Sequence, residues 1–245
     1  GADERGFAAL AAAKFEDGPY IRVPKGVRLD KPVHIVYVGT ADGQAQEAHY
    51  RGAVVLEPGA EAVVVEEYVG RGAADFFTNS VVRFELDEGA VLESYTLMRE
   101  PASFLSVRDL RARLRRDARL KAHAVALGGG LVRCDANARL DGAGADVELN
   151  GLYLAGDRQH FDFHTNIEHA KPQGTSRELY KGVLDGRSRV VFNGLIEVTP
   201  DAQKSDANVY NKNLLLSEDG LVNTKPEFKI YANDVQCKHG ATIGQ

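Results

Sequence analysis

Two stretches of the sequence repeat one pattern: LDGAGADVELNGLYL at residues 140–154 and LDGRSRVVFNGLIEV at residues 184–198. Both begin with Leu-Asp-Gly, which is turn chemistry, and both continue into an apolar run that contains Asn-Gly. Self-similarity within one chain is typical of a repeat architecture, in which each unit stacks on the one before it. The pattern therefore favours a solenoid.

Related turn motifs recur upstream, as LEPGA from Leu56, LDEGA from Leu86 and LRRDA from Leu114. Short runs rich in Val, Ile, Leu, Tyr and Phe lie between the turns, which is the pattern of β-strands at close spacing. The motifs recur at intervals of about 26 to 45 residues, in the range of solenoid repeats. We therefore expect an all-β chain, a β-solenoid with little helix. Only the Ala-rich FAALAAAKF at residues 7–15 predicts a brief helix.

The arginine-rich run LRARLRRDARLKAHAVAL at residues 110–127 could form a basic helix or a strand. Leu110, Ala112 and Leu114 alternate with Arg111 and Arg113, which is the period of a strand with an apolar inner face and a basic outer face. We expect this basic face to be mainly solvated surface, with partner contact as the alternative.

Composition limits the classes of function. The chain of 245 residues is 44% hydrophobic, with a net charge of −5 and a pI near 5.8, which argues against nucleic acid as its main partner. No apolar run approaches the roughly 20 residues of a membrane span. Two cysteines and no glycosylation sequon favour a reducing, cytoplasmic compartment. A plastid stroma stays open as an alternative, because a transit peptide would have been removed.

The motifs of several enzyme classes are missing: there is no phosphate-binding loop, no G-x-S-x-G and no H-E-x-x-H. The triple glycine at residues 128–130 is interpreted as a turn. The pairs Asn150-Gly151 and Asn193-Gly194 are also interpreted as turns. The missing phosphate-binding loop means that we expect no ATPase activity in this chain itself.

Two candidate metal ligands stand near the end of the sequence, in FKIYANDVQCKHGA at residues 228–241. If this stretch is a strand, a turn and a second strand, Cys237 and His239 share one face, about 7 Å apart. A thiolate and an imidazole suit zinc, iron or an iron–sulfur cluster, but such sites need about four ligands. The pair is half a site, and the missing ligands would come from another chain that pairs with the open edge of the last coil. From these residues alone, a buried free cysteine beside an ordinary histidine is the favoured interpretation, and the shared metal site is the alternative.

A second group of polar residues occurs in QHFDFHTNIEHA at residues 159–170. His160, Asp162 and His164 alternate onto one face, with His169 beyond them. A polar ladder on the outer face is the favoured interpretation, and a metal cluster is the alternative.

The C-terminal third resembles the SufB/SufD family of iron–sulfur cluster assembly proteins. The matching stretches include TSRELYKGVLDG, VFNGLIEV, PDAQKSDA, NKNLLLSEDG and NTKPEFKIYANDVQCKHGATIGQ. Upstream, VPKGVRLDKPVHIVY and GGLVRCDANARLDGAGADVELNGLYL are also similar to the family. The ending Cys-x-His-Gly-Ala-Thr-x-Gly is that of its SufD-type members.

The resemblance implies a right-handed parallel β-helix and a non-catalytic scaffold subunit. It implies a heterodimer with a SufB-type paralogue through the end of the β-helix, and a complex with a SufC-type ATPase that binds flanking helices. His239 matches a histidine proposed as a ligand for iron or a transient cluster at that interface, and Cys237 matches the neighbouring cysteine. Residues 1–245 would then be one β-helix core domain without the family's flanking helical regions.

Three positions depart from what the resemblance implies. Gly174 stands where relatives often have cysteine, and Asn233 stands where aspartate is usual. Cys134 matches no functional cysteine and is interpreted as structural.

The sequence is also compatible with other classes of protein. The chain could be a SufB-like paralogue, or a homodimeric structural protein that pairs its terminal edges. A β-helix carbohydrate-active enzyme would need paired carboxylates in a groove. Asp162, Glu197 and Asp206 are available, but the chain has no tryptophan.

Overall fold

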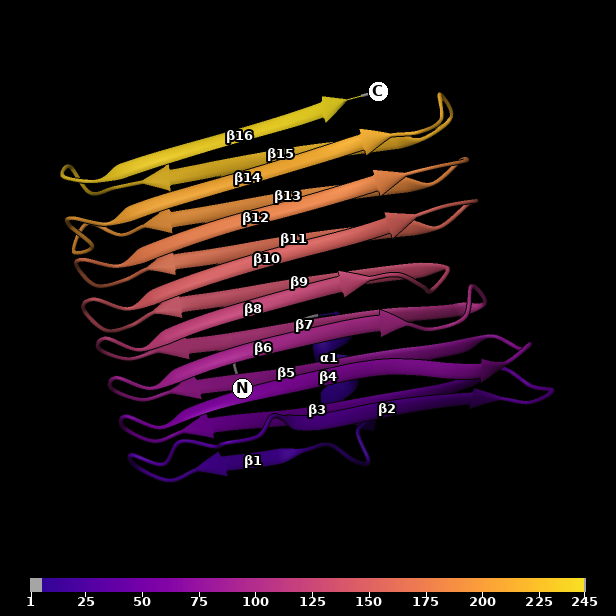
Figure 1. Ribbon diagram of the computed structural model, residues 1–245, viewed down its shortest axis with the longest axis horizontal. Helices are drawn as coiled ribbons and strands as arrows, with labels where there is room; N and C mark the ends of the chain where they lie inside the picture. The colour runs from indigo at the N-terminus through magenta and orange to yellow at the C-terminus, as the bar shows by residue number, and fades with distance from the viewer. Residues whose placement is uncertain (1–5, 245) are drawn as a thin grey trace.

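The computed structural model describes residues 6–244, and they form a flattened β-solenoid (Figure 1). Strands alternate between two parallel eight-stranded sheets, so each coil contributes one strand to each sheet. Sheet A contains β1 (Tyr20–Val23), β3 (Gln46–Leu56), β5 (Phe76–Leu86), β7 (Phe104–Leu114), β9 (Leu131–Leu140), β11 (His160–His169), β13 (Arg189–Val198) and β15 (Leu221–Ile230). Sheet B contains β2 (Val33–Ala41), β4 (Glu61–Gly72), β6 (Val91–Arg99), β8 (Arg119–Ala126), β10 (Asp146–Ala155), β12 (Thr175–Leu184), β14 (Asp206–Leu215) and β16 (Gln236–Gly244). The predicted all-β solenoid is confirmed.

The repeated sequence corresponds to a strand and a turn, which is half a coil. One coil takes 29 residues in the middle of the fold, because Leu131 lies beside His160 and His160 beside Arg189. Leu140 ends a strand of sheet A, whereas Leu184 ends a strand of sheet B. The two repeats are thus one and a half coils apart, and both sides of the solenoid use the same turn.

Three of the turns have a left-handed residue followed by a small buried one. Gly59, Gly89 and Asp117 have φ of 68°, 65° and 55°. Each is followed by an alanine with no exposed surface. The left-handed residue reverses the chain, and the alanine fits between the two sheets where a larger side chain would not.

The arginine-rich run is a strand, as its alternation predicts. Leu110, Ala112 and Leu114 are buried in β7, and Arg111 and Arg113 lie on the outer face. The run continues through a turn into β8. The triple glycine at residues 128–130 also lies in a turn, as expected.

The interpretation of the Asn-Gly pairs as turns was wrong. Asn150 and Gly151 lie within β10, and Asn193 and Gly194 lie within β13. A Cβ at Gly151 would lie 2.0 Å from the Tyr180 ring on the neighbouring strand. This glycine therefore makes room for a large ring inside the solenoid and does not form a turn.

The interior is filled by aromatic and aliphatic side chains from both sheets. Tyr153 stacks on Phe163 with a centroid distance of 5.1 Å, and Tyr180 packs on Phe192 at 4.8 Å. One hydrophobic cluster runs from Val23 in the first coil to the last coil. Most buried apolar residues therefore share one core, and two smaller clusters lie under α1 and around Phe104.

The predicted helix is present as α1 (Phe7–Lys14), which lies on the outer face of sheet A near β3 and β5 (Figure 1). Ala8 and Ala11 pack on Val81, and the Asn79 side chain donates a hydrogen bond to the carbonyl of Phe7. Within residues 6–244, no helix is long and apolar enough to cross a membrane.

Candidate functional site at the open end of the solenoid

The last coil consists of β15 and β16, joined by the turn at residues 231–235. This is the strand, turn and strand expected from the sequence. Among residues 6–244, β16 is the terminal strand of sheet B and pairs only with β14 (Figure 1). Its other edge is open, at the end of the solenoid that carries the C-terminus.

The register of β16 places both candidate ligands on the inner face. Cys237 lies beside Ala207, and His239 lies beside Val209. Ala207 and Val209 are completely buried between the sheets. In a parallel sheet, neighbours in register point to the same side. Cys237 and His239 therefore share one face, as predicted, and that face is the interior of the solenoid at its open end.

The two side chains have different surroundings. Cys237 is half-buried and packs against the core. The His239 ring is exposed on one side and meets Phe228 of β15 edge-on, with a centroid distance of 5.3 Å and an interplanar angle of 72°. Phe228 thus restricts the imidazole from inside the fold. The sequence places Phe228 in the same stretch but does not indicate this contact.

Burial raises the pKa of the Cys237 thiol above its ordinary value, and the carboxylate of Asp206 raises it further. The thiol is therefore protonated at neutral pH, and metal binding would have to displace the proton. Among the described residues there is no group of three or more histidine, cysteine or acidic side chains that could hold a metal ion. The open end of the solenoid therefore offers two metal ligands, Cys237 and His239, and not a complete metal site.

Cys134 is far from this end of the fold. It lies on β9, buried, with its Sγ 3.4 Å from Met98 Sδ, and burial raises its pKa to about 12. These surroundings agree with a structural role. Gly174 is also buried, and a Cβ there would lie 2.9 Å from Nδ1 of His169. Asn233 lies in the exposed turn before β16.

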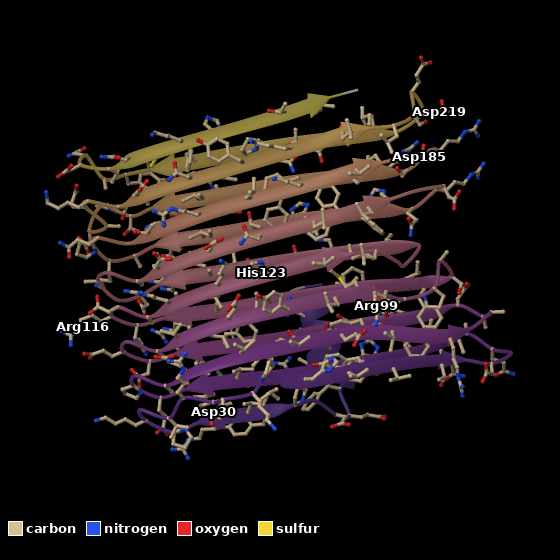
Figure 2. All side chains as sticks on the ribbon, viewed as in Figure 1. Asp30, Arg99, Arg116, His123, Asp185 and Asp219 are labelled. Atoms are coloured by element: carbon tan, nitrogen blue, oxygen red, sulfur yellow. The ribbon has the colours of Figure 1, made fainter. Side chains whose placement is uncertain are left out.

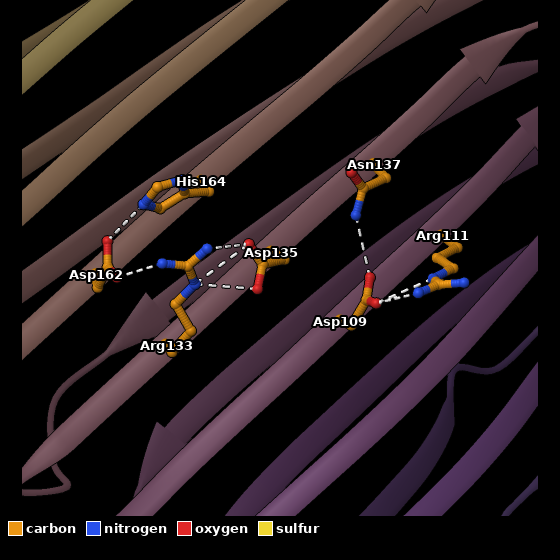
Figure 3. A network of polar contacts seen from close by, with 7 residues as sticks. All are labelled: Asp109, Arg111, Arg133, Asp135, Asn137, Asp162 and His164. Carbon is orange, nitrogen blue, oxygen red and sulfur yellow. Dashed lines mark hydrogen bonds and ion pairs between the residues drawn. The ribbon is translucent and has the colours of Figure 1, made fainter. Parts of the chain in front are cut away.

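The second polar group forms a ladder on the outer face of sheet A (Figure 3). His164 Nε2 lies 2.9 Å from Asp162 Oδ1, and Arg133 links Asp162 to Asp135. Burial alone would raise the pKa of Asp162, but hydrogen bonds from His164 and Arg133 lower it below its ordinary value. The carboxylates are therefore held by arginine and histidine.

His160 shares the outer face of β11 with Asp162 and His164, as the alternation predicts. His169 faces inward, completely buried, with its Nε2 2.8 Å from the Ser176 hydroxyl. The three carboxylates considered for a carbohydrate-active enzyme do not gather. Asp162 and Glu197 lie on sheet A, and Asp206 lies on sheet B.

The fold and this end together define a class: a parallel β-solenoid that presents a cysteine and a histidine on its terminal strand. A family model described as "SUF system FeS cluster assembly, SufBD core domain" matches residues 37–245. The chain belongs to this SufBD family of iron–sulfur cluster assembly proteins, as the resemblance predicted.

Individual relatives agree with the family match. The chain is 35% identical, over 98% of its length, to the iron–sulfur cluster assembly protein SufD of Escherichia coli (strain K12), of which it covers 57%. It is 30% identical, over 91% of its length, to the chloroplastic protein ABCI7 of Arabidopsis thaliana, of which it covers 48%. It is 31% identical, over 97% of its length, to a SufBD family protein of Mycobacterium tuberculosis, of which it covers 60%. The chain therefore spans about half to three fifths of the length of these relatives.

Proposed function

We propose that this chain is a non-catalytic scaffold subunit of an iron–sulfur cluster assembly complex. In this role it supplies Cys237 and His239 as ligands for iron or a nascent cluster at an interface with a second subunit. The observation that carries the proposal is their position: both lie on the last strand, on the inner face of the open end, without a third ligand nearby in residues 6–244. A four-coordinate site would then need about two ligands from the partner.

The protonated thiol supports a transient site. Because the pKa of Cys237 is raised by burial and by Asp206, iron competes with a proton for the sulfur. Iron is a substrate of the assembly here and not a resident cofactor. A weak half-site alone and a stronger site in the complex would let the scaffold release a finished cluster.

The open edge of β16 suggests how the partner binds. The N–H of Gln236 donates to the carbonyl of Ser205, on the side of β14. In a parallel strand the bonding direction alternates along the chain, so the backbone groups of Cys237, His239 and Ala241 face the open edge. A strand of the partner could pair there and bring its own side chains beside the two ligands.

The proposed partner is a SufB-type paralogue, and a SufC-type ATPase is proposed to join the same complex through segments outside these 245 residues. ATP-driven movement of the ATPase would then reshape the shared edge and admit iron to Cys237 and His239. The bacterial and chloroplastic relatives support a cytoplasmic or a plastid location.

The mass of the chain in solution tests the interface. Light scattering after size exclusion would be measured for the chain alone and mixed with a SufB-type subunit. We expect a one-to-one complex that forms at the expense of any homodimer. Ala241→Pro removes one edge donor without touching the β14 ladder, and it should weaken the complex while the circular dichroism stays unchanged. A complex that tolerates this change, or a homodimer that persists in the mixture, would contradict the proposed edge.

A further inference from the structure

An uncompensated pair of lysines lies on the outer face of sheet B, well inside the sheet. Lys181 of β12 and Lys212 of β14 are direct neighbours in the register, and both are exposed. Adjacent strands are about 4.8 Å apart, so the two side chains leave the sheet side by side. Like charges in this arrangement destabilise a sheet unless something neutralises them.

Arg177, the other cation on the outer face of β12, has two acidic partners, but the lysine pair has none among residues 6–244. Nearer the start of the same strands, Arg177 lies 3.8 Å from Asp146 and 3.9 Å from Asp206. Across the region described by the structure, neither Lys181 nor Lys212 has an ion-pair partner. The sheet therefore presents two adjacent positive charges without a counter-ion.

Apolar side chains lie on either side of the lysines. Leu179 and Tyr210 precede them by two residues, and Val183 and Leu214 follow them by two. A surface groove of about 450 Å³ passes over Leu179, Tyr210 and Lys212 and is also lined by Glu148 and Arg177, and Lys181 lies outside its lining. The four apolar side chains face outward, because each lies two residues from an exposed lysine and alternate residues of a strand share one face.

The neighbouring strand β10 extends the apolar surface. Leu152 lies beside Lys181, and Leu154 lies beside Val183. Leu152, Leu154 and Leu214 keep 40%, 44% and 43% of their surface exposed. We define the lysine–leucine patch as the two lysines with the apolar residues around them: Leu152, Leu154, Leu179, Lys181, Val183, Tyr210, Lys212 and Leu214. It lies toward the ends of β10, β12 and β14, near the turns that carry Asp185 and Asp219 in Figure 2.

We propose that the lysine–leucine patch binds an acidic, amphipathic α-helix of another protein. The apolar residues before and after the lysines are four positions apart along a strand, about 13 Å. This distance is close to the diameter of an α-helix with its side chains, about 10–12 Å. A helix that crosses the strands above Lys181 and Lys212 would contact both apolar groups and place aspartate or glutamate over the lysines.

Other occupants fit less well. The backbones of β12 and β14 are paired on both sides, so a peptide cannot add as a strand there. Two cations on a chain of net charge −5 are few for a nucleic acid or an anionic membrane, which are bound through many cationic contacts. The patch also faces away from the interior that holds Cys237 and His239, so it does not depend on the proposed cluster site.

Carbodiimide crosslinking tests the proposal directly, because it joins lysine amines to carboxylates that touch them. The native full-length protein would be treated in an extract of its own cells, and the peptides joined to each lysine would be identified. We expect Lys181 and Lys212 to be joined to one acidic sequence of another protein, with aliphatic residues at helical spacing. Lys171, exposed in the turn after β11, is the control. Links that are no more frequent at the pair than at Lys171, or that come from this protein itself, would overturn the proposal.

The sequence found would then be synthesised as a helix and its affinity measured by fluorescence anisotropy. Lys181→Glu with Lys212→Glu should weaken binding more than about tenfold, and so should Leu154→Asp, whereas Lys171→Glu should not. Phosphatidylserine vesicles and a single-stranded oligonucleotide would be measured beside it. Binding of either that needs the lysines but tolerates Leu154→Asp would assign the patch to an anionic surface and contradict the helix.

Discussion

Replacing Glu178 by glutamine should make the protein more stable at alkaline pH. Glu178 lies inside the solenoid on β12, with 2% of its surface exposed. Neither carboxyl oxygen has a hydrogen-bond partner in good geometry within the described part of the chain, and the nearby Thr165 hydroxyl only partly opposes the effect of burial on the pKa. Burial raises its pKa from an ordinary 4.5 to about 8. The folded protein therefore holds a proton that the unfolded chain releases near pH 4.5.

The magnitude follows from this difference in proton binding. Between pH 4.5 and about 8, only the folded state keeps the proton, so wild-type stability falls as the pH rises through this window. Each pKa unit corresponds to about 1.4 kcal/mol, so the effect at pH 8 and above is on the order of 5 kcal/mol. Glutamine resembles the protonated acid and does not titrate. The two proteins should be nearly equal at pH 4.5 and differ by several kcal/mol at pH 8.

Denaturant unfolding of both proteins, at intervals from pH 4.5 to 8.5, measures the difference between their unfolding free energies. Glu218→Gln, in the exposed turn after β14, controls for the loss of one carboxyl group. The expected result is a difference that grows with pH for Glu178→Gln and stays flat for Glu218→Gln. Parallel stability curves for Glu178→Gln and wild type would refute the argument, because the carboxyl group would then have a solvated or paired environment.

Three further predictions concern the interior. Burial lowers the pKa of His169 to about 4. About 3 kcal/mol of unfolding free energy is therefore lost as the pH falls from 6.5 toward 4, because only the unfolded chain binds the proton in this range. His169→Gln should make the unfolding free energy less dependent on pH in this range. Arg108→Met leaves Glu66 buried without its ion-pair partner and should cost about 3–5 kcal/mol in unfolding free energy; adding Glu66→Leu should recover most of it, and a double variant no better than the single one would contradict the pairing. Gly182→Ala places a Cβ 1.8 Å from the Tyr153 ring and should lower the unfolding free energy by about 1–3 kcal/mol, an effect that should shrink in a Tyr153→Leu background if the clash is its cause.

The turns and faces of the coils could be predicted because they are local. Leu-Asp-Gly marks a turn wherever it occurs, and the alternation of Leu110, Ala112 and Leu114 with arginines fixes the face of each residue. The same alternation places Glu178 in phase with Tyr180 and Leu184, so its burial was also present in the sequence as a pattern. What the pattern does not give is the neighbour on the next coil.

Contacts between residues of different coils could not be predicted from the sequence. Arg108 and Glu66 are 42 residues apart, and only the stacking of coils brings them together inside the solenoid. Asn150-Gly151 was misinterpreted for the same reason, because its glycine is required by Tyr180 on the next strand of the sheet and not by a turn. The sequence pattern of one coil does not indicate which side chain of the neighbouring coil packs against it.

The candidate site, like the fold, could be predicted in its local features but not in its contacts between strands. The spacing of Cys237 and His239 places them on one face, and the family resemblance selects them among other polar residues. The structure adds that this face is the inner one, that Phe228 meets the imidazole, and that the edge beside it is open. The unpaired Lys181 and Lys212 had no indication in the sequence, because their proximity depends on the register between β12 and β14.

The central claim is that Cys237 and His239 complete a site with a second subunit. Its most direct test is the iron and sulfide content of the complex with a SufB-type subunit, reconstituted anaerobically, for the wild type and for Cys237→Ser and His239→Ala. Lys238→Ala, on the opposite face of β16, is the matched control. We expect iron and sulfide to fall sharply in both ligand variants, with the complex still assembled and the Lys238→Ala complex fully loaded. Full loading of the two ligand variants would show that the open end of the solenoid does not hold the metal.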